Sequence, residues 1–230
     1  MQEKIILDYG CGWGGNCKFI ANRGKYIGID IDPKMIEFAQ KKYNGQFRTG
    51  NGTEIPLPDK YCDEVHCYDV LEHVKNLEKI LNELNRVLKE NGKMFIVVPA
   101  EISERVLLKL KPDYFKDVGH ERIVNPIELQ ETLIKKNIHL VTCKKVRGME
   151  AVVYAYLFAR EKNNRYMEYQ SGSPQFSKLL VAWIWLFDSR LFITPLKYLF
   201  FIYIFTLPIG WCISRFFPKS IYMVFEKRVI

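Results

Sequence analysis

The stretch from Ile5 to Gly15, which reads Ile-Ile-Leu-Asp-Tyr-Gly-Cys-Gly-Trp-Gly-Gly, decides the fold of this chain. Its leading apolar residues form a continuous run, as expected of a strand buried on both faces of a parallel sheet. The glycines that follow allow the backbone to approach a ligand where any Cβ atom would clash. A helix that begins after such a turn presents free backbone amides to the same ligand. The stretch therefore predicts a strand, a ligand-binding turn and a helix.

Two classes of nucleotide cofactor fit this turn. Gly10, Gly12 and Gly15 have the spacing of dinucleotide-binding sites. Asp8, however, lies two residues before the first glycine, where a dinucleotide would bring its pyrophosphate, and a carboxylate repels phosphate. S-adenosylmethionine (SAM) has no phosphate, and its amino acid end carries an ammonium group that a carboxylate attracts. Asp8 therefore favours SAM.

With Asp8, Gly10, Gly12 and Gly14 in the order acid-x-Gly-x-Gly-x-Gly, the chain resembles the class I SAM-dependent methyltransferases. The resemblance covers about the first 100 residues and implies SAM as methyl donor and S-adenosylhomocysteine as product. In this family a helix precedes the first strand, whereas this chain begins almost directly with the strand. We therefore expect either a truncated start or a less covered cofactor pocket.

Further segments with strand character alternate with predicted helices. The strands are expected at 25–30, 46–49, 63–69, 93–98, 138–146 and 221–227, and helices at 16–22, from Pro33, from Asn76 to Asn91-Gly92 and from Asn125 to Asn137. This alternation indicates a parallel sheet with right-handed crossovers. We therefore expect an α/β fold: a Rossmann-like three-layer sandwich with a mostly parallel seven-stranded sheet, an antiparallel last strand and a hydrophobic helical insertion between strands six and seven.

Ligands of such sheets bind beyond the carboxyl ends of the strands, and four segments place candidate residues there. Asp30 lies roughly 20 residues past the glycine turn, where a carboxylate reaches ribose hydroxyls. The resemblance assigns Asn51 to the adenine amino group, in place of an Asp; its amide oxygen can still accept a hydrogen bond, although Asn-Gly also makes a turn. The whole set predicted to bind SAM is Asp8, Gly10, Gly12, Gly14, Asp30, Ile31, Asn51, Gly52, Tyr68, Asp69 and Leu71.

Three residues are candidates for acid or base chemistry on the acceptor. The connection at 101–122 follows the fifth strand, faces the substrate in this fold and is charged and poorly periodic. It contains His120, in a Gly-His-Glu-Arg string similar to one in the quinone-methylating branches, so His120 is the first candidate. The alternative is that His120 holds this connection closed. His73 and Glu72 follow, and His73 has the same two interpretations, a structural brace or a proton acceptor.

Composition limits the other classes of function. Six cysteines without a Cys-x-x-Cys pair, and four histidines without metal-ligand spacing, predict neither disulfides nor a metal site, and so no metal cofactor is expected. The absence of a secretory signal favours a cytoplasmic location. The net charge is +8, and from Lys178 onward seven basic residues stand against two acidic ones in the most apolar third of the chain. Basic residues beside apolar runs indicate a membrane surface rather than nucleic acid.

The predicted organisation is a SAM-binding core at 1–147, an apolar helical insertion at 148–219 and a last strand at 220–230 that completes the core sheet. Within the insertion, Tyr198 to Ser214 is 17 residues without a charge, interrupted by Pro208 and Gly210. That length and those breaks favour a hairpin inserted from one leaflet over a full crossing. The contact would involve 179–217. The alternative is a hydrophobic cap or a dimer interface.

These features predict a SAM-dependent methyltransferase, peripheral or monotopic on the inner membrane face. Its acceptor is expected to be a lipid or lipid-linked molecule, such as a quinone precursor or a glycolipid. Two alternatives stay open. One is a soluble methyltransferase for a small metabolite or sugar, with the insertion buried in a dimer, and the other is a SAM-binding membrane adaptor without turnover.

Overall fold

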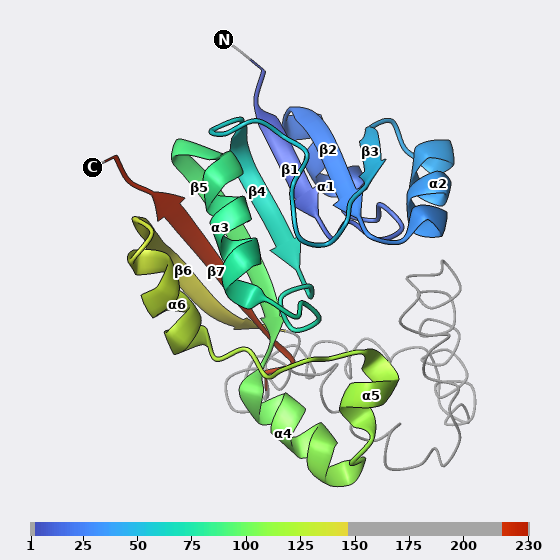
Figure 1. The fold of residues 1–230 in the computed structure, drawn as a ribbon, viewed down its shortest axis with the longest axis vertical. Coiled ribbons are helices and arrows are strands. Elements are labelled where there is room, and N and C mark those ends of the chain that lie inside the picture. The colour runs from blue at the N-terminus through green and yellow to red at the C-terminus, as the bar shows by residue number, and fades with distance from the viewer. Residues whose placement is uncertain (1–2, 147–217, 230) are drawn as a thin grey trace, which may run out of the picture.

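The computed structural model describes residues 3–146 and 218–229 (Figure 1). The insertion predicted at 148–219 lies almost wholly outside this part. The strands are β1 (Ile5–Tyr9), β2 (Lys25–Asp30), β3 (Gln46–Thr49), β4 (Cys62–Tyr68), β5 (Leu88–Pro99), β6 (Ile138–Val146) and β7 (Ser220–Lys227). The helices are α1 (Cys17–Ile20), α2 (Pro33–Lys42), α3 (Leu77–Val87), α4 (Glu101–Leu110), α5 (Tyr114–Val118) and α6 (Pro126–Ile134), with a 3-10 turn, η1 (Ala21–Arg23).

The seven strands form one sheet in the order β3-β2-β1-β4-β5-β7-β6. β1 to β5 pair in parallel, and β7 runs antiparallel to both β5 and β6. The predicted Rossmann-like α/β fold is therefore confirmed, including the antiparallel last strand, which the structure places between the fifth and sixth strands. All the parallel strands end at the same edge of the sheet, and α4 and α5 lie beyond that edge (Figure 1).

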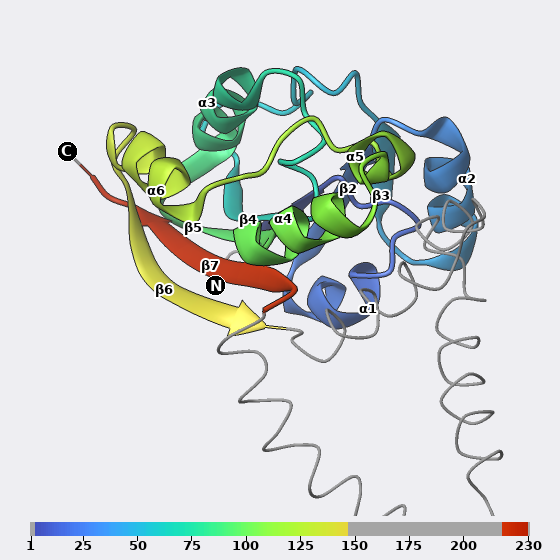
Figure 2. The ribbon, with the colours of Figure 1, turned by 90° about the horizontal axis from the view of Figure 1, so that it is seen from below.

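Helices cover both faces of the sheet, with α3 and α6 on one face and α1 on the other (Figure 2). The two residues at the centre of the leading apolar run divide between these layers. Ile6 belongs to the apolar cluster shared by α1 and α2, whereas Leu7 belongs to the larger cluster under α3 and α6. Both side chains are 0% exposed. Complete burial of each contributes roughly 1.5–3 kcal/mol, which explains why the run is apolar without alternation.

The third helix is shorter than the sequence predicts. We expected it to continue to Asn91-Gly92, but α3 ends at Val87, and Leu88 already pairs with Cys62 of β4. The register between β4 and β5 shifts after this pair, and Asn91 has a φ of 60°. The Asn-Gly pair therefore makes an irregularity inside β5 instead of a helix end, because strand pairing across to β4 competes with one more helical turn.

The connection at 101–122 was expected to be irregular, and this expectation is wrong, because it contains α4 and α5. The inward face of α4 carries Ser103 and Glu104 besides Leu107, while three apolar residues of the same helix point outward. An amphipathic pattern predicts a helix when apolar residues face the interior. In α4, two polar residues face the interior, and one of them, Ser103, donates from its Oγ to Pro218 O at 2.5 Å. The apolar inward face that would predict a helix from the sequence is therefore incomplete.

Candidate functional site

The glycine turn after β1 has the conformation that the sequence predicts. Gly10, Gly12 and Gly14 have φ values of +74°, +51° and +75°, which L side chains rarely adopt. A Cβ atom at Gly10 would lie 2.2 Å from Val70 Cγ2, so that glycine is also needed for packing. Among the described residues, the atom nearest to a Cβ at Gly12 would be 3.9 Å away, and none would lie within 4 Å of a Cβ at Gly15. The turn thus exposes backbone to open space, as a cofactor cradle requires.

Asp8 lies beneath this turn with 1% of its surface exposed. The Tyr26 hydroxyl donates to Asp8 Oδ2 at 2.5 Å, and Asn16 Nδ2 donates to Oδ1 at 3.5 Å. Burial raises the pKa of the Asp8 carboxyl, and the hydrogen bond from Tyr26 opposes this rise. One carboxylate oxygen is thus firmly held, and the other makes a long contact.

Asp30 ends β2 and bonds to the backbone on both sides. Gly12 N donates to Asp30 Oδ2 at 2.8 Å, and Asp32 N donates to Oδ1 at 3.0 Å. The carboxylate is therefore fixed against the glycine turn at the mouth of the site. The next residue, Ile31, is 66% exposed and forms an apolar surface beside it.

Asn51 and Gly52 form a tight turn after β3. Asn51 Oδ1 accepts hydrogen bonds from Thr53 N at 2.9 Å, Thr53 Oγ1 at 3.1 Å and Glu54 N at 2.8 Å. Gly52 has a φ of +73°. The structure thus shows the turn that Asn-Gly predicts, with the amide oxygen already engaged in it.

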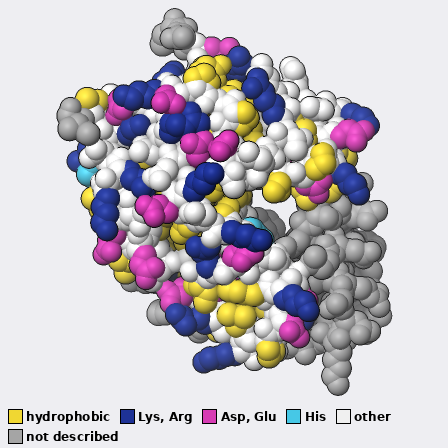
Figure 3. All heavy atoms as spheres, in the orientation of Figure 1, with side chains coloured by type: hydrophobic (Ala, Val, Ile, Leu, Met, Phe, Trp, Pro, Cys, Tyr) yellow, Lys and Arg dark blue, Asp and Glu magenta, His cyan; other side chains and the backbone are white. Residues whose placement is uncertain are grey.

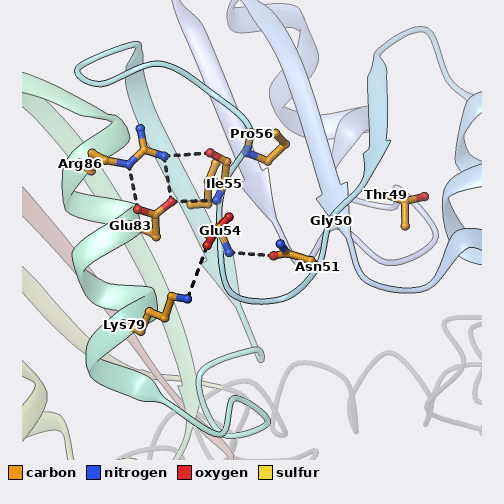
Figure 4. Close-up of a pocket in the computed structure, with 9 residues that line it drawn as sticks. All are labelled: Thr49, Gly50, Asn51, Glu54, Ile55, Pro56, Lys79, Glu83 and Arg86. Atoms are coloured by element: carbon orange, nitrogen blue, oxygen red, sulfur yellow. Dashed lines mark hydrogen bonds and ion pairs between the residues drawn. The ribbon is translucent and has the colours of Figure 1, made fainter.

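A cavity of about 700 Å³ opens between this turn and α3 (Figure 4). Asn51 is the member of the predicted SAM set among its lining residues, which are Thr49, Gly50, Asn51, Glu54, Ile55, Pro56, Lys79, Glu83 and Arg86. Arg86 bonds to Glu83, to Asp59 and to the carbonyls of Ile55 and Leu57. One wall of the cavity is therefore a hydrogen-bonded network that holds the 55–59 segment against α3.

The residues predicted at the end of β4 take three different positions. The Tyr68 hydroxyl lies 2.6 Å from His66 Nδ1. Asp69 has a φ of 52°, and its backbone N donates to Val97 O at 2.9 Å. Leu71 is 0% exposed and belongs to the main apolar cluster. This segment therefore turns sharply at Asp69 and then anchors itself in the core.

The segment after β4 and the segment after α5 meet at the carboxyl edge of the sheet. Glu121 N donates to Glu72 O at 2.8 Å, and Arg122 Nη2 donates to Val74 O at 2.8 Å and Lys75 O at 2.7 Å. These bonds bring His120 next to the other two candidate acid or base residues, Glu72 and His73, which lie far before it in the sequence.

A cluster of five polar side chains results, which we call the edge cluster: Glu72, His73, Glu104, Tyr114 and His120. His120 Nδ1 lies 2.7 Å from Glu104 Oε2, and the Tyr114 hydroxyl donates to Glu104 Oε1 at 3.0 Å. His73 Nδ1 lies 2.9 Å from Gly119 O, and the two histidine rings meet edge to face with centroids 4.7 Å apart.

Burial controls the electrostatics of the edge cluster. Glu72 is 1% exposed, and its pKa is raised well above the usual value by burial and then by the charge of Asp69. Burial also lowers the pKa of His73, against the hydrogen bond to Gly119 O. A neutral His73 can accept a proton at Nε2. Figure 3 shows a histidine side chain at the margin of a hollow between the surface of α4 and the rest of the molecule.

Sequence reasoning missed Glu104 and Tyr114. Both lie in the connection expected to be irregular, and Glu104 is 16 residues from His120. It also missed Tyr26, which holds Asp8 from the neighbouring strand. A polar residue on the inward face of an unrecognised helix leaves no periodic signal. The pairing of Tyr26 with Asp8 follows from strand order, which becomes visible once β1 and β2 are placed side by side.

Residues 7–96 match the family model described as a methyltransferase domain. A probable S-adenosylmethionine-dependent methyltransferase of Mycolicibacterium smegmatis is 31% identical over 130 residues, which are 56% of this chain and 49% of that protein. A demethylmenaquinone methyltransferase of Tropheryma whipplei is 33% identical over 96 residues, 40% of each chain. The chain thus spans half or less of the length of these relatives.

Among solved structures, a SAM-dependent methyltransferase from Archaeoglobus fulgidus superposes with a TM-score of 0.61. It is 19% identical, and the match covers 97% of this chain and 86% of the other. At that identity the likeness concerns the fold, which agrees with the strand order described above.

Proposed function

Because residues 7–96 match the methyltransferase domain family, we propose that this chain is a SAM-dependent methyltransferase that transfers a methyl group to a lipid or lipid-linked acceptor at a membrane surface. The observation that carries the proposal is the meeting of two groups of residues at one edge of the sheet. The glycine turn, Asp8 and Asp30 form the donor side, and the edge cluster forms the acceptor side.

The donor side fits SAM in both shape and charge. Open space lies over Gly12 and Gly15, and the buried Asp8 carboxylate has one oxygen with only a long contact to Asn16. We assign Asp8 to the ammonium end, Asp30 to the ribose hydroxyls and the exposed Ile31 to the adenine face. Asn51 Oδ1 already accepts three hydrogen bonds within its own turn. In this assignment, therefore, the turn as a whole borders the edge of the adenine.

The acceptor side is suited to orienting a nucleophile and taking its proton. SAM supplies a methyl group bonded to a sulfonium sulfur, so the protein contributes mainly alignment. We propose His120 or His73 as the proton acceptor. Each histidine has its Nδ1 within hydrogen-bonding distance of a fixed oxygen, which leaves Nε2 for the acceptor group. Glu72, with its raised pKa, is the third candidate.

Two observations support an apolar acceptor. The outward face of α4 carries Ile102, Val106 and Leu110, which are 42%, 39% and 48% exposed. Their spacing of four residues aligns them in one stripe along the helix, within the apolar patch visible over this part of Figure 3. The second observation is the relative from Tropheryma whipplei, whose name gives demethylmenaquinone as what it methylates.

The membrane contact rests on the sequence of 179–217, which lies wholly outside the described residues. In the part of the chain that the structure describes, no helix is both long and apolar enough to cross a bilayer. We propose a contact from one side, to which the apolar stripe of α4 and the basic flanks of 179–217 both contribute.

The test is to incubate the full chain with SAM and either a membrane lipid extract or an aqueous metabolite extract. We expect S-adenosylhomocysteine release with the lipid extract, and one lipid species heavier by one CH₂ group. Flotation with anionic vesicles should carry the protein upward. Turnover confined to the aqueous extract, from a chain that ignores vesicles, would replace the lipid acceptor with a small metabolite. Tight SAM binding without turnover on either extract would indicate an adaptor.

A further inference from the structure

Three side chains of the edge cluster converge, and one of them keeps a buried oxygen without a hydrogen-bond partner among the described residues. Ligand atoms of Glu72, His73 and His120 all lie within 4.8 Å of one another. His73 Nε2 is 3.9 Å from Glu72 Oε1. Glu72 Oε2 is buried and has no hydrogen-bond partner among the described residues, although a buried carboxylate oxygen without a partner costs free energy. Something that compensates this oxygen is therefore expected at the cluster.

The histidines are held in the tautomer that a metal ion requires. Gly119 O has no hydrogen to give, so the hydrogen between it and His73 belongs to Nδ1 of the ring. His120 Nδ1 likewise faces a carboxylate oxygen, Glu104 Oε2. When a ring held in this way is neutral, its lone pair is on Nε2. Metal-binding histidines in proteins almost always donate their other N–H to a carbonyl or carboxylate in this way.

From this arrangement we propose that Glu72, His73 and His120 bind a divalent first-row transition metal ion, with Glu104 and Gly119 O orienting the two rings. Two imidazoles and one carboxylate suit zinc or iron rather than magnesium, which prefers oxygen ligands and retained water. Around zinc at 2.0–2.1 Å, tetrahedral ligand atoms are about 3.3 Å apart, so ligand atoms that lie up to 4.8 Å apart close in by at most about 1.5 Å on binding.

The sequence predicts no metal site because its histidines lack the close spacing that metal ligands often have along a chain. His73 and His120 are separated by α3, β5, α4 and α5, and the fold brings them together. Three protein ligands leave coordination positions open. His73 is the accessible member, with 36% of its side chain exposed, whereas His120 and Glu72 are nearly buried. The open positions therefore face the side from which an acceptor arrives.

This role rests on the proposed function and takes the place of the histidine base in it, because an ion bound to Nε2 of both rings would bind an oxygen of the methyl acceptor and make its proton easier to lose. The two proposals are nevertheless separable. Metal binding is measured on the full chain without an acceptor, and methyl transfer is measured with and without a chelator. Metal binding without any turnover would contradict the proposed function alone. Turnover by a chain that binds no metal would contradict this inference alone.

The binding experiment is a titration of the full chain with Zn²⁺ against a competing chromophoric chelator. We expect one ion per chain. Glu72→Gln and His120→Asn should each weaken binding more than about 100-fold, and Glu104→Gln by about 10- to 100-fold, as loss of an orienting partner does. His139→Asn, which changes a histidine on β6, and Cys143→Ser, which removes an exposed thiol, should leave binding unchanged. Equal affinity in all five variants, or loss with His139→Asn or Cys143→Ser, would overturn the inference.

A second measurement does not depend on the variants folding. The chain has four histidines, so the ring nitrogens of the unsubstituted protein can be followed by ¹⁵N NMR during Zn²⁺ addition. Two rings should shift at Nε2 and keep their Nδ1 proton. The rings of His66 and His139 should not shift. Perturbation of neither or only one of the edge-cluster rings, or of the other two instead, would contradict the site.

Discussion

At the scale of single residues, Asp30 makes the sharpest prediction for the donor side. Its carboxylate accepts from Gly12 N and Asp32 N, and in our assignment it also binds the ribose. A hydrogen bond to a charged group contributes about 1.5–3 kcal/mol, so Asp30→Ala should weaken SAM binding by roughly 10- to 150-fold. Calorimetric titration with SAM measures this.

The matched control for Asp30 is its neighbour Asp32. Asp32 Oδ1 accepts from Lys34 N and caps α2 without touching the glycine turn. Asp32→Asn keeps a capping side chain and removes the charge. It should therefore leave SAM affinity unchanged. Equal losses in both variants, or unaltered affinity in Asp30→Ala, would count against the ribose assignment.

Glu64 makes a prediction about pH and stability away from the site. Its pKa is lowered from 4.5 to about 2, chiefly by the hydrogen bond to His66, with Lys4 and Arg23 also lowering it against the effect of burial. Because the folded pKa lies below the unfolded one, this stabilisation is complete above about pH 4.5 and is lost as pH falls toward 2. Urea unfolding between pH 6 and 2 measures it.

The size of this effect follows from the shift. A change from 4.5 to about 2 corresponds to roughly 3 kcal/mol, which the solvent exposure of Lys4 and Arg23 reduces to about 2. Glu64→Gln should remove this part of the acid dependence. Glu37→Gln, on an exposed pair with Lys41, should change the curve much less. Identical acid profiles for the native chain and Glu64→Gln would show that Glu64 is not the responsible group.

At the scale of elements, α4 explains why part of the site was missed. Ser103 and Glu104 face inward beside Leu107, where they bond to Pro218 O, Tyr114 and His120, while Ile102, Val106 and Leu110 face outward. The inward face of α4 is therefore mixed, unlike the apolar face of a core helix. The hydrogen bonds of the polar residues go to partners far away in the sequence, and no local sequence pattern predicts those partners. By contrast, β1, β2 and β6 were predicted closely, because burial and turn chemistry in these segments are local.

A polar substitution in the outward apolar stripe of α4 should weaken membrane or acceptor contact without loss of stability. Val106→Ser should alter unfolding free energy by less than about 0.5 kcal/mol, because the side chain is 39% exposed. Vesicle flotation, or turnover on a lipid acceptor, should fall clearly. Lys109→Ser, on an exposed position of the same helix outside the stripe, is the control for charge. Flotation that depends on Lys109 but not on Val106 would indicate a purely electrostatic contact.

At the scale of the whole molecule, the strand order brings residues that follow or end five strands to one edge of the sheet. The glycine turn follows β1, Asp30 ends β2, Asn51 follows β3 and the edge cluster follows β4 and β5. The donor side could be predicted from sequence because each of its residues lies at the end of a recognisable strand. The acceptor side could not be assembled in this way. His73, Glu104 and His120 come from three separate segments, and the contacts between Glu121 and Glu72 and between Arg122 and the 74–75 backbone help to hold two of these segments together.

The place of β7 in the sheet has a consequence for the whole chain. β7 pairs with β5 and β6 over its full length, so a chain cut before Ser220 loses the strand between them. Deletion of 218–230 should therefore abolish cooperative unfolding, because β6 would have no partner strand in the described sheet. Circular dichroism during heating measures this. Retention of a native-like transition would contradict the role of β7.

The central claim is that this chain moves the methyl group of SAM to a lipid acceptor. The most direct test uses SAM with an isotopically labelled methyl group, the purified full chain and a membrane lipid extract. We expect label in one lipid species, in an amount equal to that of the S-adenosylhomocysteine released. Asp30→Ala should reduce both amounts, and Asp32→Asn should leave both unchanged. Sustained absence of label from every lipid, while SAM stays bound and intact, would contradict it.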